Sequence, residues 1–332
     1  GCTGLTDLTL PTKLSSIGAS AFRECSGLTS LNIPEPVISI ADHAFRDCGG
    51  LREVRLGKSV ASIGSYAFSG CTQLKELEIP DAVTILGAGA FASCKSLEAV
   101  SIPPELTHGI YTSPTSSEGA TLSQFFGCSA VKTVTIKTPA VTPVFTDWID
   151  NDRLKTNAVS KIIFSEGVND IGDQSFKNKS SLQTVEFPES AARIGNLAFH
   201  NCTGLKEVAI EKGVKSIAGN AFEGCVKLTA INVSDLNTAY SSEDGILLNK
   251  NGETLIKCPE GKTGVCSLPE EVTTISGSAF RRCADLTAVT MPEGLTGIGS
   301  HAFSECTGLT GVTIPESVTS IGSHAFSGCA GL

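Results

Sequence analysis

Residues 48–71 read CGGLREVRLGKSVASIGSYAFSGC, and this stretch contains the unit from which the chain is built. Its two cysteines, Cys48 and Cys71, are 23 positions apart, and the same interval recurs wherever the pattern is regular. The cysteines that keep this spacing are Cys2, Cys25, Cys48, Cys71, Cys94, Cys202, Cys225, Cys283, Cys306 and Cys329. A fixed period of this length indicates a stack of similar units rather than globular domains.

Two further sets of apolar residues recur at fixed distances from the cysteine position. A phenylalanine stands three residues before it in most units: Phe22, Phe45, Phe68, Phe91, Phe125, Phe176, Phe199, Phe222, Phe280, Phe303 and Phe326. An apolar residue stands eight residues after it: Leu10, Ile33, Leu56, Ile79, Ile102, Ile136, Phe164, Phe187, Ile210, Val233, Leu268, Met291 and Ile314. The second set identifies thirteen turns of one unit.

Each unit contains one predicted strand and one predicted corner. Leu31 and Ile33 alternate with polar residues, which is the period of a strand with one buried face. Pro34 then ends the strand because it has no N–H to donate, and a glycine such as Gly64 suits a tight corner of the backbone. Because a 23-residue unit cannot bury its apolar face alone, the units must stack. The sequence therefore predicts one curved solenoid.

The repeated pattern C-x-x-L-x-x-(L/V/I)-x-(L/I)-P, followed by V-x-x-I-G-x-x-A-F-x-x-C, resembles the BspA-like leucine-rich repeat family over essentially the whole chain. The resemblance implies a leucine-rich repeat solenoid, a curved right-handed superhelix with a parallel β-sheet on its concave face and short helical or 3-10 turns elsewhere. It also implies surface proteins of bacteria or protozoan parasites that act in adhesion and protein binding. It implies no enzymatic activity and supplies no catalytic residues.

We expect a single leucine-rich repeat domain over residues 1–332, with about 13 units. The period is irregular at 104–123 and 137–160, and a β-hairpin is inserted at about 235–262. The hairpin is predicted because apolar runs flank Asn251-Gly252, a strong turn signal. Both ends fall in mid-unit without polar capping units, so we expect the chain to be a fragment of a longer protein.

Composition excludes some classes of partner. The chain has 25 Lys and Arg against 34 Asp and Glu, a net charge of −9, whereas a phosphate-backbone binder needs clustered basic residues. No apolar run approaches the roughly 18 residues that span a membrane. We therefore expect no nucleic-acid partner and no membrane insertion in this segment. The family resemblance, and not the composition, implies a protein or host-surface partner.

The thirteen cysteines predict buried free thiols rather than a metal site or a disulfide framework. Cysteines at one repeated position have parallel Cβ directions and two identical neighbours, and C-x-x-C spacing is absent. The alternative of a disulfide is strongest for Cys258 and Cys266, which are eight residues apart. His301 and His324 share one position and should stack on a solvated surface. We predict no cofactor and no metal.

The candidate partner-binding residues lie in the irregular segments. Residues 139–157 lose the Ala-Phe-x-x-Cys signature and contain the single Trp of the chain, a residue type that is enriched at binding hot spots. The acidic residues there lack the spacing of a calcium loop. The proposed residues are Tyr111, Phe145, Asp147, Trp148, Asp150 and Asp152. The alternative is that Trp148 only fills the space left by the absent Phe and Cys.

The sequence leaves two functions open. The first is a non-enzymatic cell-surface or secreted protein that mediates adhesion or protein–protein interaction. The second is a passive structural spacer within a larger surface protein. An adhesive protein should carry exposed aromatic or charged side chains at its irregular units, whereas a spacer should lack such side chains throughout.

Overall fold

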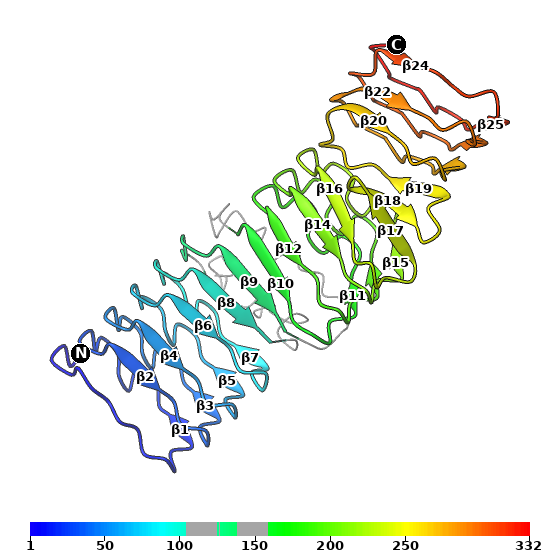
Figure 1. The fold of residues 1–332 in the computed structure, drawn as a ribbon. Helices are drawn as coiled ribbons and strands as arrows, with labels where there is room; N and C mark the ends of the chain where they lie inside the picture. The colour runs from blue at the N-terminus through cyan, green and yellow to red at the C-terminus, as the bar shows by residue number, and fades with distance from the viewer. Residues whose placement is uncertain (104–124, 126, 138–158) are drawn as a thin grey trace. The chain divides into compact units, whose positions relative to one another are not determined.

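The computed structural model describes residues 1–103, 125, 127–137 and 159–332. They fall into two compact units, Gly1–Ser165 and Glu166–Leu332, and each unit is a stack of β-coils (Figure 1). The predicted leucine-rich repeat solenoid is confirmed. The expected short helical or 3-10 turns are wrong for the described ranges, where every regular element is a strand and turns join the strands. A single domain over the whole chain stays a prediction.

One strand of each coil belongs to a first row of parallel strands. In β2 and β4, Leu31 pairs with Val54 in register, and both side chains are buried between exposed neighbours. In the first unit the row contains β2 (Ser30–Asn32), β4 (Glu53–Arg55), β6 (Glu76–Glu78), β8 (Ala99–Ile102), β9 (Thr133–Ile136) and β10 (Lys161–Phe164). In the second it contains β12 (Thr184–Glu186), β14 (Glu207–Ile210), β16 (Ala230–Val233), β20 (Gly264–Ser267), β22 (Leu286–Thr290) and β24 (Gly311–Val312).

A second row of short parallel strands, which the sequence did not predict, lies on the other side of each coil. Its strands have mostly two residues, and in β3 and β5 the pairs are Ser39 with Ser62 and Ile40 with Ile63. In the first unit the row contains β1 (Ser16–Ile17), β3 (Ser39–Ile40), β5 (Ser62–Ile63) and β7 (Ile85–Leu86). In the second it contains β11 (Asp170–Ile171), β13 (Arg193–Ile194), β15 (Ser216–Ile217), β21 (Thr274–Ile275), β23 (Gly297–Ile298) and β25 (Ser320–Ile321).

The chain then turns back to the cysteine position through two residues with left-handed backbone geometry. In the second coil these residues are His43, with φ of 59°, and Asp47, with φ of 60°. Such values are uncommon for residues other than glycine. Here the neighbouring coil holds them, because the N–H of His43 donates to Ser65 O at 2.9 Å and that of Asp47 to Ser69 O at 2.7 Å.

The phenylalanines form a ladder inside the coils. Phe45 and Phe68 are fully buried, and their rings stack with centroids 5.2 Å apart. The ladder runs from Phe22 to Phe125 in the first unit. In the second unit it runs from Phe176 to Phe222 and resumes at Phe280. Each coil therefore depends on its neighbours for burial, as the repeat pattern predicted.

The predicted hairpin interrupts the ladder between Phe222 and Phe280. Strands β17 (Tyr240–Glu243), β18 (Ile246–Asn249) and β19 (Thr254–Lys257) pair antiparallel in succession, so the hairpin around Asn251-Gly252 is confirmed. Strand β19 also pairs parallel with β21, with Leu255 opposite Ile275. The insertion therefore returns to the stack through the second row.

The cysteines are free thiols, as predicted, and Cys258 and Cys266 form no disulfide. Eleven of the thirteen are buried, whereas Cys2 is exposed and Cys329 is half-buried. The imidazole rings of His301 and His324 stack with their centroids 4.9 Å apart, which confirms the predicted pairing. In the described ranges no helix has the length and apolar character needed to cross a bilayer.

Candidate functional site: a polar pocket beside the hairpin

The partner-binding residues predicted from the sequence lie outside the described residues. They are Tyr111, Phe145, Asp147, Trp148, Asp150 and Asp152. The irregular ranges 104–123 and 137–160 lie almost wholly outside the described part as well. Their role stays a prediction. The third irregular region, the hairpin insertion, is fully described, and a candidate site lies next to it.

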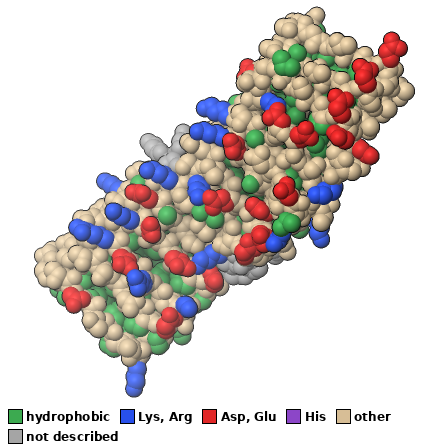
Figure 2. All heavy atoms as spheres, in the orientation of Figure 1, with side chains coloured by type: hydrophobic (Ala, Val, Ile, Leu, Met, Phe, Trp, Pro, Cys, Tyr) green, Lys and Arg blue, Asp and Glu red, His purple; other side chains and the backbone are tan. Residues whose placement is uncertain are grey.

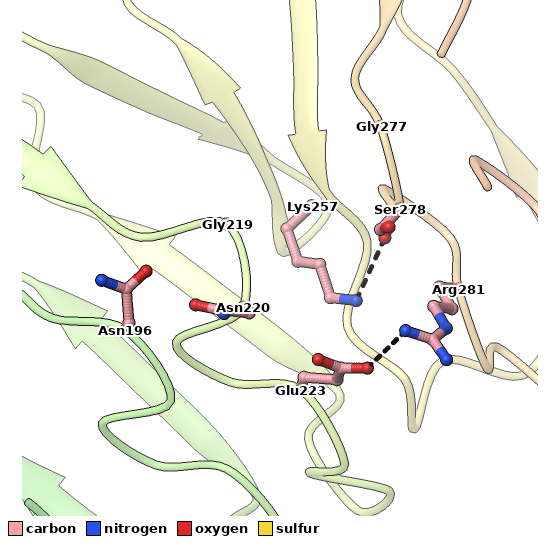
Figure 3. Close-up of a pocket in the computed structure, with 8 residues that line it drawn as sticks. All are labelled: Asn196, Gly219, Asn220, Glu223, Lys257, Gly277, Ser278 and Arg281. Atoms are coloured by element: carbon pink, nitrogen blue, oxygen red, sulfur yellow. Dashed lines mark hydrogen bonds and ion pairs between the residues drawn. The ribbon is translucent and has the colours of Figure 1, made fainter. Parts of the chain in front are cut away.

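A polar pocket of about 320 Å³ lies beside the hairpin insertion in the second unit. One wall is the coil that precedes the insertion, with Asn220 and Glu223, and the other is the coil that follows it, with Ser278 and Arg281. Lys257, from the end of β19, extends between the two walls (Figure 3). Polar and charged side chains from three segments thus converge on one space.

Lys257 and Glu260 form a buried charged pair next to this space. Their exposed fractions are 6% and 3%, and the lysine Nζ lies 3.5 Å from Glu260 Oε1 and 3.4 Å from Ser278 O. Glu260 Oε1 also accepts a 2.9 Å hydrogen bond from the N–H of Gly224, whereas its Oε2 has no partner among the described residues. Burying a charged pair costs desolvation energy unless hydrogen bonds compensate it, and this pair is only partly compensated.

Arg281 connects the two walls electrostatically. Its guanidinium lies 2.9 Å from Glu223 across the pocket and 3.0 Å from Glu305 in the next coil. Arg282 adds a second 3.0 Å contact to Glu305. The hydrogen bond from Arg281, and then that from Arg282, hold the pKa of Glu305 below its ordinary value. Because cations and carboxylates are paired, the pocket offers donors and acceptors without a dominant charge.

The surface shows the same mixing of signs. Figure 2 shows basic and acidic side chains interspersed over the visible face of the first unit, with acidic side chains gathered near the C-terminal end of the second. Within the described ranges no group of three His, Cys, Asp or Glu side chains could hold a metal ion. The chemistry available at the pocket is therefore hydrogen bonding and ion pairing by side chains and backbone.

The sequence pattern predicted the hairpin as a structural insertion and did not predict this pocket. A signal is recognisable only once the register of the insertion is known from the structure, with Leu255 opposite Ile275. Lys257 precedes Cys258 at a place where regular coils have the Ala of Ala-Phe, such as Ala67 before Phe68. A charged residue at a core position is rarely tolerated unless it has a partner.

Stacked β-coils of one repeated length, with a leucine at a fixed core position, define the class of leucine-rich repeat proteins. The family model for the BspA type leucine rich repeat region matches residues 1–113, 147–244 and 262–332, in six copies. The chain therefore belongs to the BspA-type leucine-rich repeat family, as the sequence pattern predicted.

Several solved structures are similar to this chain. A leucine rich cell surface protein from Faecalibacterium prausnitzii is 27% identical, with 96% of this chain and 69% of that chain covered and a TM-score of 0.48. A leucine-rich repeat protein from Eubacterium ventriosum is 23% identical, with coverages of 92% and 64% and a TM-score of 0.43. One from Bacteroides ovatus is 22% identical, with coverages of 96% and 81% and a TM-score of 0.43. No curated protein matches the chain.

Proposed function

We propose that this chain is a non-enzymatic protein-binding module of a cell-surface or secreted protein, and that it mediates adhesion or another protein–protein interaction. Membership of the BspA-type family supports a repeat scaffold for protein interaction. The proposed partner is another protein, such as one on a host surface. The polar pocket beside the hairpin is one proposed place of contact.

The observation that carries this proposal is the position of the charged side chains. Regular coils use their inward positions for packing, as Phe45 and Phe68 show. The irregular coil at the hairpin instead places Lys257 beside a pocket, and the coils before and after it contribute Glu223 and Arg281, which pair across that pocket. Irregular units of a solenoid often mark its binding face, and paired charges at such a place favour recognition over a passive spacer.

The other irregular segments extend the proposal. Tyr111, Phe145, Asp147, Trp148, Asp150 and Asp152 are proposed as further partner contacts, because aromatic residues are enriched at binding hot spots. They are independent of the pocket in the sequence, so the two sets of contacts can be tested separately.

The test is adhesion of beads coated with the purified chain to a panel of immobilised extracellular-matrix proteins and cultured epithelial cells. We expect saturable adhesion to at least one surface and its reduction by Ser278→Trp, which places a large side chain in the pocket. His324→Trp is the matched control, because both residues have left-handed φ values, 59° and 58°. The absence of saturable adhesion to any surface would support the passive spacer instead.

A further inference from the structure

The coil formed by the hairpin insertion is two residues shorter than a regular coil at its turn. In a regular coil the chain runs five positions from the second-row isoleucine to the phenylalanine, as from Ile275 to Phe280. In the insertion, Leu255 occupies the second-row position opposite Ile275. Cys258 occupies the phenylalanine position, because its N–H donates to Ala279 O at 2.8 Å just as Phe280 N–H donates to Ala302 O. The interval is therefore three positions.

This shortening removes one set of the backbone hydrogen bonds that join the turn of each coil to the turn of the next. We call the series of these hydrogen bonds the backbone ladder, and each set between two turns a rung. In the preceding coil, Phe199 N–H donates to Ala221 O at 2.8 Å. The next rung would begin at Asn220 and Phe222, but neither N–H has a partner among the described residues. On the opposite wall the carbonyl of Gly277 is equally unpaired there, whereas that of Ser300, one coil later, accepts from Ser278 N–H.

The turn before the shortened coil has also changed its conformation. Nine residues at the position five before the cysteine position have φ between 53° and 59°: Ser20, His43, Tyr66, Gly89, Gln174, Leu197, Ser278, His301 and His324. Asn220 stands at the same position but does not have a positive φ. Its side-chain Oδ1 accepts from Leu197 N–H at 3.3 Å, a role that a backbone carbonyl plays in regular coils. The turn loses the regular geometry where no following rung holds it.

We propose that the pocket binds an exposed turn of a partner protein, two to three residues long, whose peptide groups replace the absent rung. This inference rests on the proposed protein-binding function and names the chemical class of ligand at the pocket. The pocket lies between Asn220 on one wall and Ser278 on the other (Figure 3), the two positions that flank the deleted turn. Its volume of about 320 Å³ lies near the lower end of ligand pockets.

The pocket favours a peptide over an anion or an apolar ligand. An anion would need a net positive site, but Lys257 is paired with Glu260, and Arg281 with Glu223 and Glu305. An apolar ligand would leave the free N–H and C=O groups of the walls buried without partners, which is costly. A peptide group supplies both an acceptor and a donor. The volume of about 320 Å³ further restricts the ligand to small side chains.

The probe is the tetrapeptide acetyl-Gly-Ser-His-Ala-amide, which has the sequence of the regular turn at 322–325. It is titrated into the full chain and followed by amide NMR shifts and calorimetry. We expect saturable binding with shifts at Asn220 and Gly277, and at least a tenfold loss of affinity in Ser278→Trp. His324→Trp, at an equivalent turn, should bind as the unchanged protein does. Acetyl-tetraproline-amide, which has no backbone N–H inside the peptide, should not bind.

A second variant guards against misfolding of Ser278→Trp. Inserting Gly-Ser between Ile256 and Lys257 restores the regular interval, so the chain itself should fill the pocket and peptide binding should disappear. Absence of saturable binding to the unchanged protein would overturn the inference. So would an affinity in both pocket variants equal to that of the unchanged protein. If the tetrapeptide does not bind but the coated beads still adhere, the protein-binding function stands and only the peptide-turn inference is lost.

Discussion

The thiol of Cys48 donates a 3.0 Å hydrogen bond to the carbonyl oxygen of Phe22, one coil earlier in the stack. In return, the N–H of Phe22 donates at 2.8 Å to the carbonyl oxygen of Ala44, in the same coil as Cys48. Burial raises the pKa of the Cys48 thiol to about 11. The repeated cysteine is therefore a small buried donor that joins adjacent coils, and its protonated form is the one that the fold requires.

Thiol labelling should separate the cysteines by burial. In native protein at pH 8 we expect fast modification of Cys2, the exposed cysteine, and slow modification of Cys48, Cys71 and Cys225, whose pKa values burial raises. Mass spectrometry of the modified peptides measures this directly. Cys2→Ser is the control that removes the fast phase. Fast native labelling of several buried cysteines would contradict the burial of the cysteine column.

Phe68→Ala should open a cavity in the ladder. Because Phe68 is fully buried between Phe45 and Phe91, we expect a loss of about 3–5 kcal/mol in the free energy of unfolding. Hydrogen exchange should accelerate mainly in its own and the adjacent coils, since each coil contacts only its neighbours. Ile85→Ala, at a side chain that is 63% exposed, is the control. Uniform acceleration over both units would argue against a stacked array.

Gly64→Ala should destabilise the stack whereas Gly18→Ala should not, although both glycines follow a second-row isoleucine. A Cβ on Gly64 would lie 2.5 Å from the backbone N of Asp42 in the preceding coil, but one on Gly18 would meet nothing within 4 Å. The sequence predicted a corner glycine, and the physical cause is this close approach rather than a positive φ. We expect a cost of about 1–3 kcal/mol for Gly64→Ala, measured by urea unfolding. Equal stability of the two variants would contradict this cause.

Acid should weaken the ion pairs at Glu305. The hydrogen bond from Arg281, followed by that from Arg282, lowers the pKa of Glu305 from its ordinary 4.5. A carboxyl group with a lowered pKa stabilises the fold above its unfolded pKa, and this contribution is lost as pH falls through the folded pKa. Because the side chain is 43% exposed, we expect its contribution to the free energy of unfolding to be less than about 1 kcal/mol.

The check is urea unfolding of the unchanged protein and of Glu305→Gln at pH 7 and pH 3. The variant should lose less stability on acidification than the unchanged protein. Glu293→Gln, at an exposed glutamate, should behave as the unchanged protein does. A pH dependence of Glu305→Gln equal to that of the unchanged protein would show that the ion pairs do not contribute.

The parts of the fold that follow from side-chain periodicity could be predicted from the sequence. The Phe and Cys columns and the turn at Asn251-Gly252 lead directly to the stacked coils and the hairpin, because burial and turn geometry depend on residue type. The second strand row could not be predicted, because strands of two residues have no period. The left-handed backbone geometry of His43 and Asp47 could not be predicted either, because hydrogen bonds to the next coil impose it at residues that are not glycine.

The pocket could not be predicted for a related reason. Its existence depends on a register, with Leu255 opposite Ile275 and Cys258 in the phenylalanine position, and register between an insertion and a regular coil is set by tertiary pairing. From the sequence, the same residues are compatible with a hairpin that projects from an unbroken stack. The predicted contacts around Trp148 have no described geometry and remain a prediction.

The measurement that tests the interrupted ladder most directly is native-state hydrogen exchange at two equivalent amides, Phe199 and Phe222, in the unliganded full chain. We expect Phe222, which has no backbone acceptor among the described residues, to exchange faster than Phe199, which donates to Ala221 O. Gly224, held by Glu260, should stay protected, and the tetrapeptide should slow exchange at Phe222. Equal protection of Phe199 and Phe222 without ligand would contradict the interrupted ladder on which the pocket depends.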